Sequence, residues 1–294
     1  MVIFIKTHLK DFYRLEVLLE SIDKYNVNNI PVHICTDATS YDDLINWLDT
    51  SRYFTYNDRD ILEQAVIDGD YDPRTLRRKL NRWEVQQIVK FEFCKNMSSD
   101  NCIIIDSDNQ FIKNFTEKDF MNEDGEIYTI MSTVEERCRE FADDLADDML
   151  DYRDAKTFMS AIRERVQEQF SREGEVYEFG PTPVIWSKKV VNDFYNNYLI
   201  PNKKSFVDII NLVPIEYNWY GEWLLLNKSI PLIPKKPLFK NITSQEQYDN
   251  LIEKGITTDD LREEYLGINI QSNWSKIGWD SVNNTTTGIL KYEL

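Results

Sequence analysis

The chain has 294 residues, 42% of them hydrophobic, and a formal charge of −17 at pH 7. This length and composition fit a folded protein with one sizeable core. The acidic balance argues against a nucleic-acid partner, because binding phosphates needs a basic surface that releases counterions. The sequence contains neither an apolar run of about 18 residues nor the apolar core of a signal peptide. We therefore expect a soluble, cytoplasmic protein without a transmembrane segment.

The first part of the chain alternates between strand and helix patterns. The β-rich runs Val2–Ile5 and Val32–Cys35 predict two strands. Between them, apolar residues with helical spacing predict a helix, and Asp11 stands where it could cap that helix. The apolar residues are Leu15, Leu18, Leu19 and Ile22. This order of strand, helix and strand is typical of a parallel, doubly wound sheet.

The next segments lead to a third strand. Tyr41–Leu48 predicts a helix, whereas Ser51–Asp72 is polar and aromatic and has no clear pattern. Thr75–Lys95 predicts a long helix with apolar residues on two opposite faces, so we expect it to be covered on both sides. It leads into the apolar run Cys102–Ile105, which predicts a buried strand.

Beyond residue 125 the sequence becomes acidic and helical. Glu135–Asp154 predicts an amphipathic helix with a solvated acidic face. Gly180–Pro183 interrupts the chain before another predicted strand, Val184–Trp186, and an aromatic block follows after Pro214. The elements together predict an α/β fold in which a mixed, mainly parallel sheet is flanked by helices, with a helical insertion and a C-terminal extension.

Two carboxylates, Asp106 and Asp108, directly follow the strand Cys102–Ile105. Residues two apart in an extended chain project to the same side, and open α/β sheets bind ligands at the carboxyl ends of their strands. Carboxylates together with phosphate oxygens are the ligands that Mg²⁺ and Mn²⁺ prefer. The pair therefore predicts a site for a metal and a diphosphate. The alternative is that one aspartate only caps the turn after the strand.

The stretch CIIIDSDNQF resembles the Asp-x-Asp motif of the GT-A class of nucleotide-sugar glycosyltransferases, which follows a hydrophobic strand in the middle of a Rossmann-like domain. Three further stretches look like a bacterial and viral group within this class. They are the N-terminal VIFIKTHLKDFYRLEVLLESI, a Trp-x-x-Gln-Gln-x-x-Lys pattern in RWEVQQIVKFEF, and a Glu-Tyr-x-x-Tyr-Gly pattern in EYNWYG. The resemblance covers most of residues 1–225.

This resemblance implies a single GT-A-like catalytic domain over residues 1–294. Its nucleotide-binding half would span residues 1–125, its acceptor-side half 126–240, and a C-terminal segment 241–294. The implied activity is metal-dependent transfer of a hexosyl or pentosyl group from a nucleoside-diphosphate sugar donor to a glycan or another hydroxyl acceptor.

The resemblance also implies roles for residues at the strand ends. Thr7 and Asp37 would contact the base and ribose of the donor, whereas Asp106 and Asp108 would hold the ribose and a Mn²⁺ or Mg²⁺ ion on the diphosphate. The ion would neutralise charge on the leaving nucleoside diphosphate.

One feature departs from the class. Many of its members add a late histidine as a metal ligand, but the sequence contains only His8 and His33. A carboxylate, an Asn or water would have to complete the coordination, and the affinity for the ion would be weak.

The densest basic cluster in this acidic chain comprises Arg77, Arg78, Lys79 and Arg82. Arg78 and Arg82 lie one helical turn apart, and forked guanidinium groups match phosphate oxygens. We therefore expect these two arginines to contact the diphosphate, with Lys90 as a further candidate on the same helix. Ion pairs with surface acids are an equally good explanation of the cluster.

Glu216 and Glu222 flank the aromatic block. If the reaction inverts the anomeric centre, a carboxylate must accept the proton of the acceptor hydroxyl, and Glu216 is the first candidate. Its alternative role is that of an acidic residue favoured at a helix N-terminus. Trp219, Tyr220 and Trp223 could stack on sugars, although aromatic residues with helical spacing are more often part of a core.

Two other functions stay open. Haloacid-dehalogenase-like phosphohydrolases also end a hydrophobic strand in Asp-x-Asp and use the first carboxylate as the nucleophile. Their motif occupies the first strand and is followed by Thr or Val, whereas here it comes late and Asn109 follows it. The other alternative is a non-catalytic scaffold that binds nucleotides or glycans.

Overall fold

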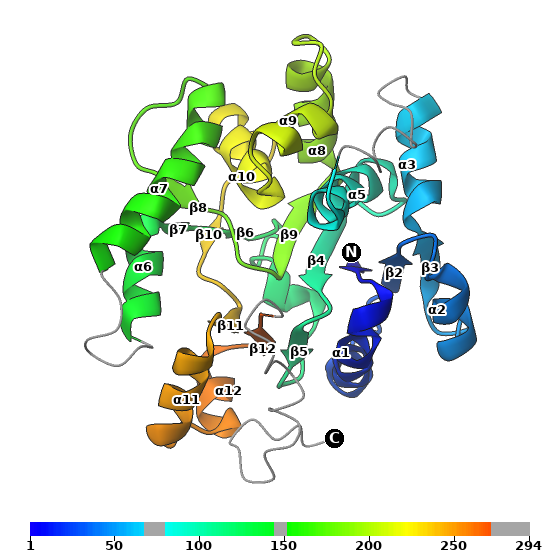
Figure 1. Cartoon of the computed structure of the whole chain (residues 1–294), viewed down its shortest axis with the longest axis vertical. Coiled ribbons are helices and arrows are strands. Elements are labelled where there is room, and N and C mark those ends of the chain that lie inside the picture. Colours follow the sequence, from blue (N-terminus) through cyan, green and yellow to red (C-terminus); the bar gives the residue numbers. More distant parts are fainter. Residues whose placement is uncertain (68–79, 144–151, 272–294) are drawn as a thin grey trace.

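The computed structural model of the chain describes residues 1–67, 80–143 and 152–271. Its centre is a five-stranded sheet in the order β3-β2-β1-β4-β9 (Figure 1). The strands are β1 (Val2–Lys6), β2 (Val32–Thr36), β3 (Phe54–Asn57), β4 (Asn101–Asp106) and β9 (Val184–Ser187). All neighbouring pairs are parallel except β4 and β9. The predicted mixed, mainly parallel sheet is confirmed.

The apolar sequences of β1 and β4 place these strands at the centre of the sheet. Ile3, Phe4 and Ile5 are fully buried, as is every residue of Cys102–Ile105. A parallel strand that is covered on both faces reads as a continuous apolar run, because neither face meets water. Within the pair, Phe4 lies beside Ile104.

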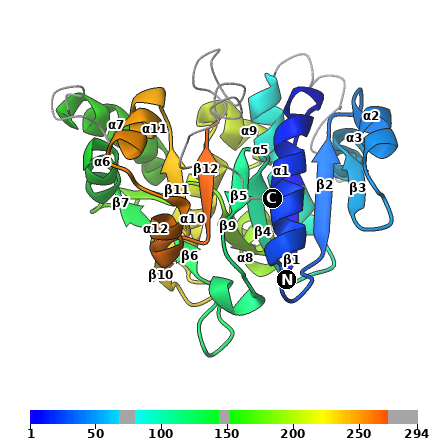
Figure 2. The same ribbon diagram turned by 90° about the horizontal axis from the view of Figure 1, so that it is seen from below.

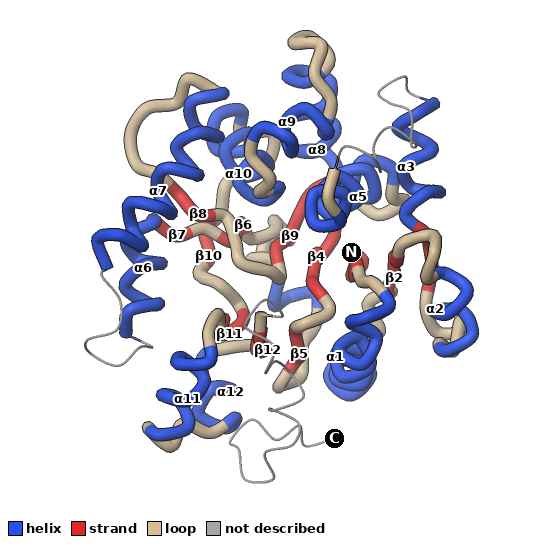
Figure 3. The backbone as a smooth tube through the Cα atoms, in the orientation of Figure 1, coloured by secondary structure: helices blue, strands red, loops and turns tan. Residues whose placement is uncertain are grey.

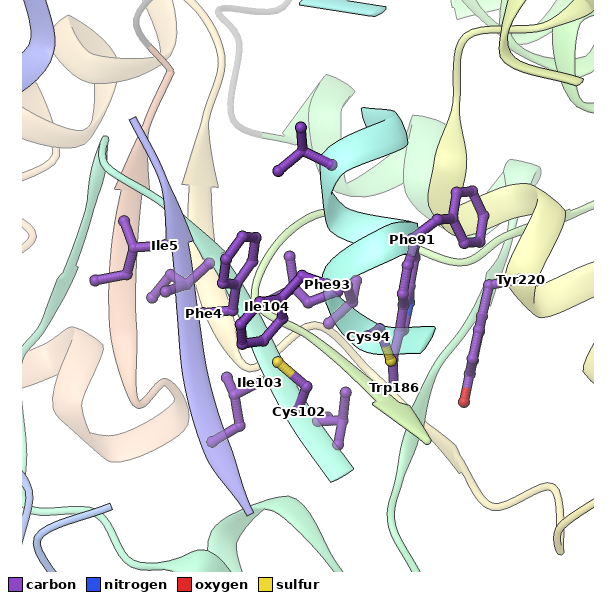
Figure 4. Packing of buried hydrophobic residues seen from close by; sticks show 14 of the residues in the cluster. Phe4, Ile5, Phe91, Phe93, Cys94, Cys102, Ile103, Ile104, Trp186 and Tyr220 are labelled. Atoms are coloured by element: carbon purple, nitrogen blue, oxygen red, sulfur yellow. The ribbon is translucent and has the colours of Figure 1, made fainter. Parts of the chain in front are cut away.

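Helices cover both faces of this sheet (Figure 3). In Figure 1, α1 (Phe12–Tyr25) lies on one side of β1 and α5 (Arg82–Asn96) on the other. The ring of Phe4 on β1 stacks on that of Phe93 on α5, with 3.9 Å between the centroids (Figure 4). The outer side of α5 contacts α8 (Lys188–Phe194) and α9 (Phe206–Leu212). The prediction that this helix is covered on both sides is confirmed.

The structure shows how α5 and α1 begin. Asn81 caps α5 through a hydrogen bond from the backbone N–H of Glu84, so the described helix begins at Arg82; the predicted start at Thr75 lies outside the described residues. Asp11 is the N-cap residue of α1 but makes no capping hydrogen bond. Its carboxylate instead contacts Arg14.

The segment between β2 and α5 forms more structure than its sequence pattern indicates. The predicted helix is observed as α2 (Tyr41–Trp47), and the unassigned stretch contains β3 and α3 (Asp58–Ile67). β3 is an edge strand without a buried residue, which explains why its hydrophobic pattern is weak.

The acidic region contains two helices, α6 (Val134–Asp143) and α7 (Tyr152–Gln169), which contact each other. The chain then passes through β9 to the cluster of α8, a π-helical turn (Tyr195–Leu199), α9 and α10 (Glu216–Asn227). Within the described part of the chain, no helix combines the length and the apolar character needed to cross a bilayer.

The last described segment pairs with β5, the strand that follows β4 of the central sheet. Strands β11 (Phe239–Ile242) and β12 (Gly267–Ile270) form a three-stranded sheet with β5 (Asn109–Phe111), in which β12 is antiparallel to β5 (Figure 2). The helices α11 (Gln245–Glu253) and α12 (Thr258–Glu264) carry part of a second apolar cluster beside it. The short remaining elements are Leu9–Asp11, Glu117–Phe120, β6 (Thr129–Ile130), β7 (Ser132–Thr133), β8 (Tyr177–Glu178) and β10 (Pro234–Lys235).

Candidate active site

A cavity of about 710 Å³ lies at the carboxyl ends of β1, β2 and β4. These three strands are parallel neighbours, so their carboxyl ends lie together, which is where open α/β sheets bind ligands. Helix α5 and the start of α10 contribute further walls. The sequence-predicted residues that line the cavity are Thr7, Asp37, Arg82, Lys90, Asp106, Asp108 and Glu216.

Lys90 connects two carboxylates in this cavity. Its Nζ lies 2.9 Å from Asp106 Oδ1 and 2.8 Å from Glu216 Oε1. The side chains of Lys90 and Glu216 are only 3% and 5% exposed, whereas that of Asp106 is 28% exposed. Burial alone would lower the pKa of Lys90, but the two carboxylates outweigh this effect and raise its pKa above the usual range. Lys90 is therefore a fixed positive charge.

Two glutamines of α5 support the same pair of carboxylates. Gln86 Nε2 donates to Asp106 Oδ1 over 2.8 Å, and Gln87 Oε1 accepts a 3.1 Å hydrogen bond from the backbone N–H of Glu216. Gln86 and Lys90 are four residues apart and so share one face of the helix. The polar residues of the Trp-x-x-Gln-Gln-x-x-Lys pattern thus hold a strand end and a helix start in fixed positions.

Two segments that are distant in the sequence also contact the aspartate pair. Thr182 Oγ1 donates to Asp106 Oδ2 at 3.3 Å. Asp108 Oδ1 accepts from Asn109 Nδ2 at 3.3 Å and from Asn269 Nδ2 at 3.0 Å. The loop before β9 and the strand β12 therefore both contribute to the same small region.

The ends of β1 and β2 form the opposite part of the cavity. Asp37 Oδ2 accepts hydrogen bonds from the hydroxyls of Thr39 and Ser40 at 2.7 and 2.8 Å. Burial would raise the pKa of Asp37, but these hydrogen bonds and the charge of Lys6 lower it overall, so this carboxylate stays ionised. Thr7 is buried beside it, and its hydroxyl lacks a hydrogen-bond partner in the described chain.

The residues around Asp106 and Asp108 fit a hard divalent cation that keeps ligands from water or phosphate. Both carboxylates line an open cavity, and Asn269 and Gln271 add amide groups to its wall. The described residues contain no group of three or more His, Cys, Asp or Glu side chains placed to hold a metal ion. Two carboxylate ligands of this kind suit Mg²⁺ or Mn²⁺, which usually bind one or two carboxylates together with substrate phosphates.

One predicted site residue, Glu222, lies away from this cavity, and another, Arg78, cannot be placed because it belongs to the part of the chain that the structure does not describe. Glu222 is fully buried away from it, where both of its carboxylate oxygens are bound by Arg172. Glu216 and Glu222 are six residues apart on one helix, so they point in different directions. Arg78, like Arg77 and Lys79, lies outside the described residues.

The aromatic block of α10 belongs to the core. Trp219, Tyr220 and Trp223 are at most 6% exposed. The Trp219 indole N–H donates to the carbonyl of Val213, and Tyr220 stacks on Trp186 with 4.9 Å between the centroids (Figure 4). The core alternative is therefore the one that the structure supports. The aromatic residues that do line the cavity are Trp83 and Tyr217.

Sequence reasoning missed several residues of the cavity. Gln86 belongs to the Trp-x-x-Gln-Gln-x-x-Lys pattern, but the pattern alone gave it no role. Lys6 directly follows an apolar run, as Asp106 does, and a charged residue at the end of a predicted strand is a signal for a site. Thr182 and Asn269 carry no local signal, because only the folding of distant segments brings them to Asp106 and Asp108.

Comparison with known proteins gives a family and two architectural similarities. Residues 1–237 match the model described as "Family of unknown function (DUF6492)". The crystal structure of mouse xyloside xylosyltransferase 1 in its apo form is similar over 92% of this chain and 98% of that chain, with 9% identity and a TM-score of 0.41. The apo structure of the bifunctional glycosyltransferase WbbM is similar over 92% of this chain but only 45% of that chain, with 13% identity and a TM-score of 0.46. A search of the curated proteins gives no match.

Proposed function

Because the chain belongs to the Family of unknown function (DUF6492), we propose its activity from the cavity itself: it is a glycosyltransferase that depends on a divalent cation. It moves a sugar from a nucleoside-diphosphate donor to a hydroxyl of a glycan or another acceptor. The observation that carries this proposal is the pair Asp106 and Asp108 beside the Lys90–Glu216 ion pair in one cavity. The cavity volume of about 710 Å³ is within the usual range for a small-molecule site.

In this proposal the nucleoside lies at the ends of the first two strands. The ionised carboxylate of Asp37 accepts a hydrogen bond from a ribose hydroxyl, and Thr7 contacts the base. The hydroxyl of Thr7 has no hydrogen-bond partner among the residues that the structure describes, and this supports the role, because a buried polar atom without a hydrogen bond is costly unless a ligand satisfies it.

Asp106 and Asp108 hold Mn²⁺ or Mg²⁺ in this proposal. When bound, the cation supplies positive charge that stabilises the leaving nucleoside diphosphate. Lys90 keeps Asp106 in place and adds a fixed positive charge to the same region. Arg82, at the first turn of α5, faces the same cavity and contributes a guanidinium group for the diphosphate.

Glu216 is the residue proposed to accept the proton of the acceptor hydroxyl. Lys90 contacts its Oε1, and the backbone N–H of Glu216 is held by Gln87, so the carboxylate is fixed at the cavity wall. Oε2 then takes the proton as the hydroxyl oxygen bonds to the anomeric carbon and the bond from that carbon to the diphosphate breaks, which releases the nucleoside diphosphate. Glu222 has no part in this scheme, because Arg172 occupies both of its oxygens.

Activity assays test the proposal against its alternatives. Purified protein is incubated with a panel of nucleoside-diphosphate sugars and Mn²⁺, and nucleotide release and sugar transfer are measured. Metal-dependent turnover is expected, whereas release of phosphate from an aryl phosphate instead would indicate a phosphohydrolase. Nucleotide binding without turnover would indicate a binding scaffold.

The Asp108→Asn variant is the specific test of the carboxylate pair. It removes one negative charge but keeps the shape of the side chain, so the fold should persist. We expect metal-dependent transfer to fall by at least about 100-fold, in line with the loss of a key electrostatic group. Full activity in a normally folded Asp108→Asn protein would contradict the metal-binding role.

A further inference from the structure

The segment that follows the family match reaches the candidate active site. Asn269 on β12 lies beyond the matched residues 1–237, is 3% exposed and lines the cavity. Its Nδ2 lies 3.0 Å from Asp108 Oδ1 and 3.4 Å from the Asp108 carbonyl oxygen. The next backbone N–H, that of Ile270, donates to the same carbonyl at 3.0 Å. Three contacts thus tie Asp108 to β12.

Sheet pairing sets the position of this amide. β12 runs antiparallel to β5, with Asn269 directly opposite Asn109. Asn109 Nδ2 donates to the same Asp108 oxygen and also to the carbonyl of Asp106. The turn between β4 and β5 is consequently held by residues of both β5 and β12. The Asp108 side chain lies between the buried amides of Asn109 and Asn269.

We infer that Asn269 is a positioning residue for Asp108 and that strand β12 is part of the cation and diphosphate site. The inference rests on the proposed function, since the ligand is a divalent cation held together with a nucleoside diphosphate. A hydrogen-bond partner that orients a metal-binding carboxylate typically contributes about 10- to 100-fold to metal affinity.

The two aspartates are held by different kinds of group. Lys90 forms an ion pair with Asp106, whereas the side-chain amides of Asn109 and Asn269 donate hydrogen bonds to Asp108 Oδ1. These two hydrogen bonds fix the position of the Asp108 carboxylate.

The matched test compares two asparagines of neighbouring strands. Asn241 on β11 pairs directly with Asn269 in the sheet, is similarly buried and does not line the cavity. Calorimetry measures the binding of Mn²⁺ with UDP, GDP, ADP or CDP to the wild-type protein and to the Asn269→Ala and Asn241→Ala variants. We expect about 10- to 100-fold weaker Mn²⁺ binding in the nucleotide complex for Asn269→Ala and unchanged binding for Asn241→Ala.

The same experiment separates two kinds of failure. If the wild-type protein binds these nucleotides with Mn²⁺ and Asn269→Ala binds them equally well, the positioning role is overturned while the proposed function stands. If the wild-type protein binds none of them with Mn²⁺, the proposed function and the inference both fail.

An Asn269→Asp variant adds a readout that a purely structural residue would not change. It places a third carboxylate beside Asp108, and like charges at this distance repel unless a cation lies between them. We expect a lower melting temperature than that of the wild type without metal and a larger increase on addition of Mn²⁺ alone. A lower melting temperature with the wild-type increment for Mn²⁺ would overturn the inference.

Discussion

Lys90 offsets the negative charges of two carboxylates in the candidate site, those of Asp106 and Glu216. Burying an ammonium group without a partner costs free energy, but the two carboxylates compensate this cost for Lys90 on α5. Without it, Asp106 and Glu216 would meet as two negative charges with little water to screen them. Lys90 thus offsets the repulsion between two carboxylates that both contact its ammonium group.

A Lys90→Met variant tests this dependence. Methionine keeps the apolar stem and removes the charge, so a buried carboxylate is left without its partner. We expect the free energy of unfolding at pH 7 to fall by about 3–5 kcal/mol, as measured by urea denaturation. Adding Glu216→Gln to the same protein should restore part of this loss, because it removes one of the unpaired charges.

The exposed residue Lys118 provides the matched control. Lys118→Met should change the free energy of unfolding by no more than about 0.5 kcal/mol, as is usual for surface substitutions. If Lys90→Met were as stable as this control, the buried ion pair would not support the fold.

At the scale of elements, α10 is held against the loop that leads into β9. A methyl group on Gly221 would lie 2.0 Å from the nearest ring atom of Phe179, which is almost fully buried. The same loop carries Thr182, a partner of Asp106. The glycine of the Glu-Tyr-x-x-Tyr-Gly pattern thus allows the helix and the loop to approach closely, which aligns two walls of the cavity.

A Gly221→Ala variant tests this close approach. Alanine favours a helix interior by about 1 kcal/mol over glycine, but overpacking a core costs about 1–3 kcal/mol. The contact with Phe179 is so short that we expect the upper end of this cost and a net destabilisation of about 2 kcal/mol, measured by urea denaturation. Leu226→Ala, at an exposed position of the same helix, is the control; a stabilised Gly221→Ala protein would contradict the packing argument.

Elements with strong local patterns could be predicted from the sequence, and elements defined by their neighbours could not. β1 and β4 are buried on both faces, so their apolar runs identify them. β3 lies at the sheet edge and β12 pairs with a strand more than a hundred residues away, so neither carries a sufficient local signal. The sequence alone also could not tell which of Glu216 and Glu222 faces the cavity, because this depends on where α10 packs in the fold.

At the scale of the whole molecule, the candidate site joins segments from both ends of the described chain. Asp106, Asp108 and Lys90 could be predicted as candidates because the two aspartates directly follow an apolar run and Lys90 belongs to a predicted helix. Thr182 and Asn269 could not, because they reach the aspartates only after the loop before β9 and the C-terminal sheet have folded. A ligand in this cavity contacts residues between Lys6 and Gln271, so it should bind only the folded chain.

Ligand binding should therefore stabilise the protein globally. A ligand that binds only the folded state at 100 times its dissociation constant adds about 2.7 kcal/mol, and for a chain somewhat larger than 250 residues each kcal/mol raises the melting temperature by about 2 °C. We expect the matching nucleoside diphosphate with Mn²⁺ to raise the melting temperature by about 5 °C, and EDTA to remove most of this increase. Asp108→Asn should show no Mn²⁺-dependent part of the increase. An equal increase with and without Mn²⁺ would mean that the nucleotide binds without the cation, and the carboxylate pair would need another explanation.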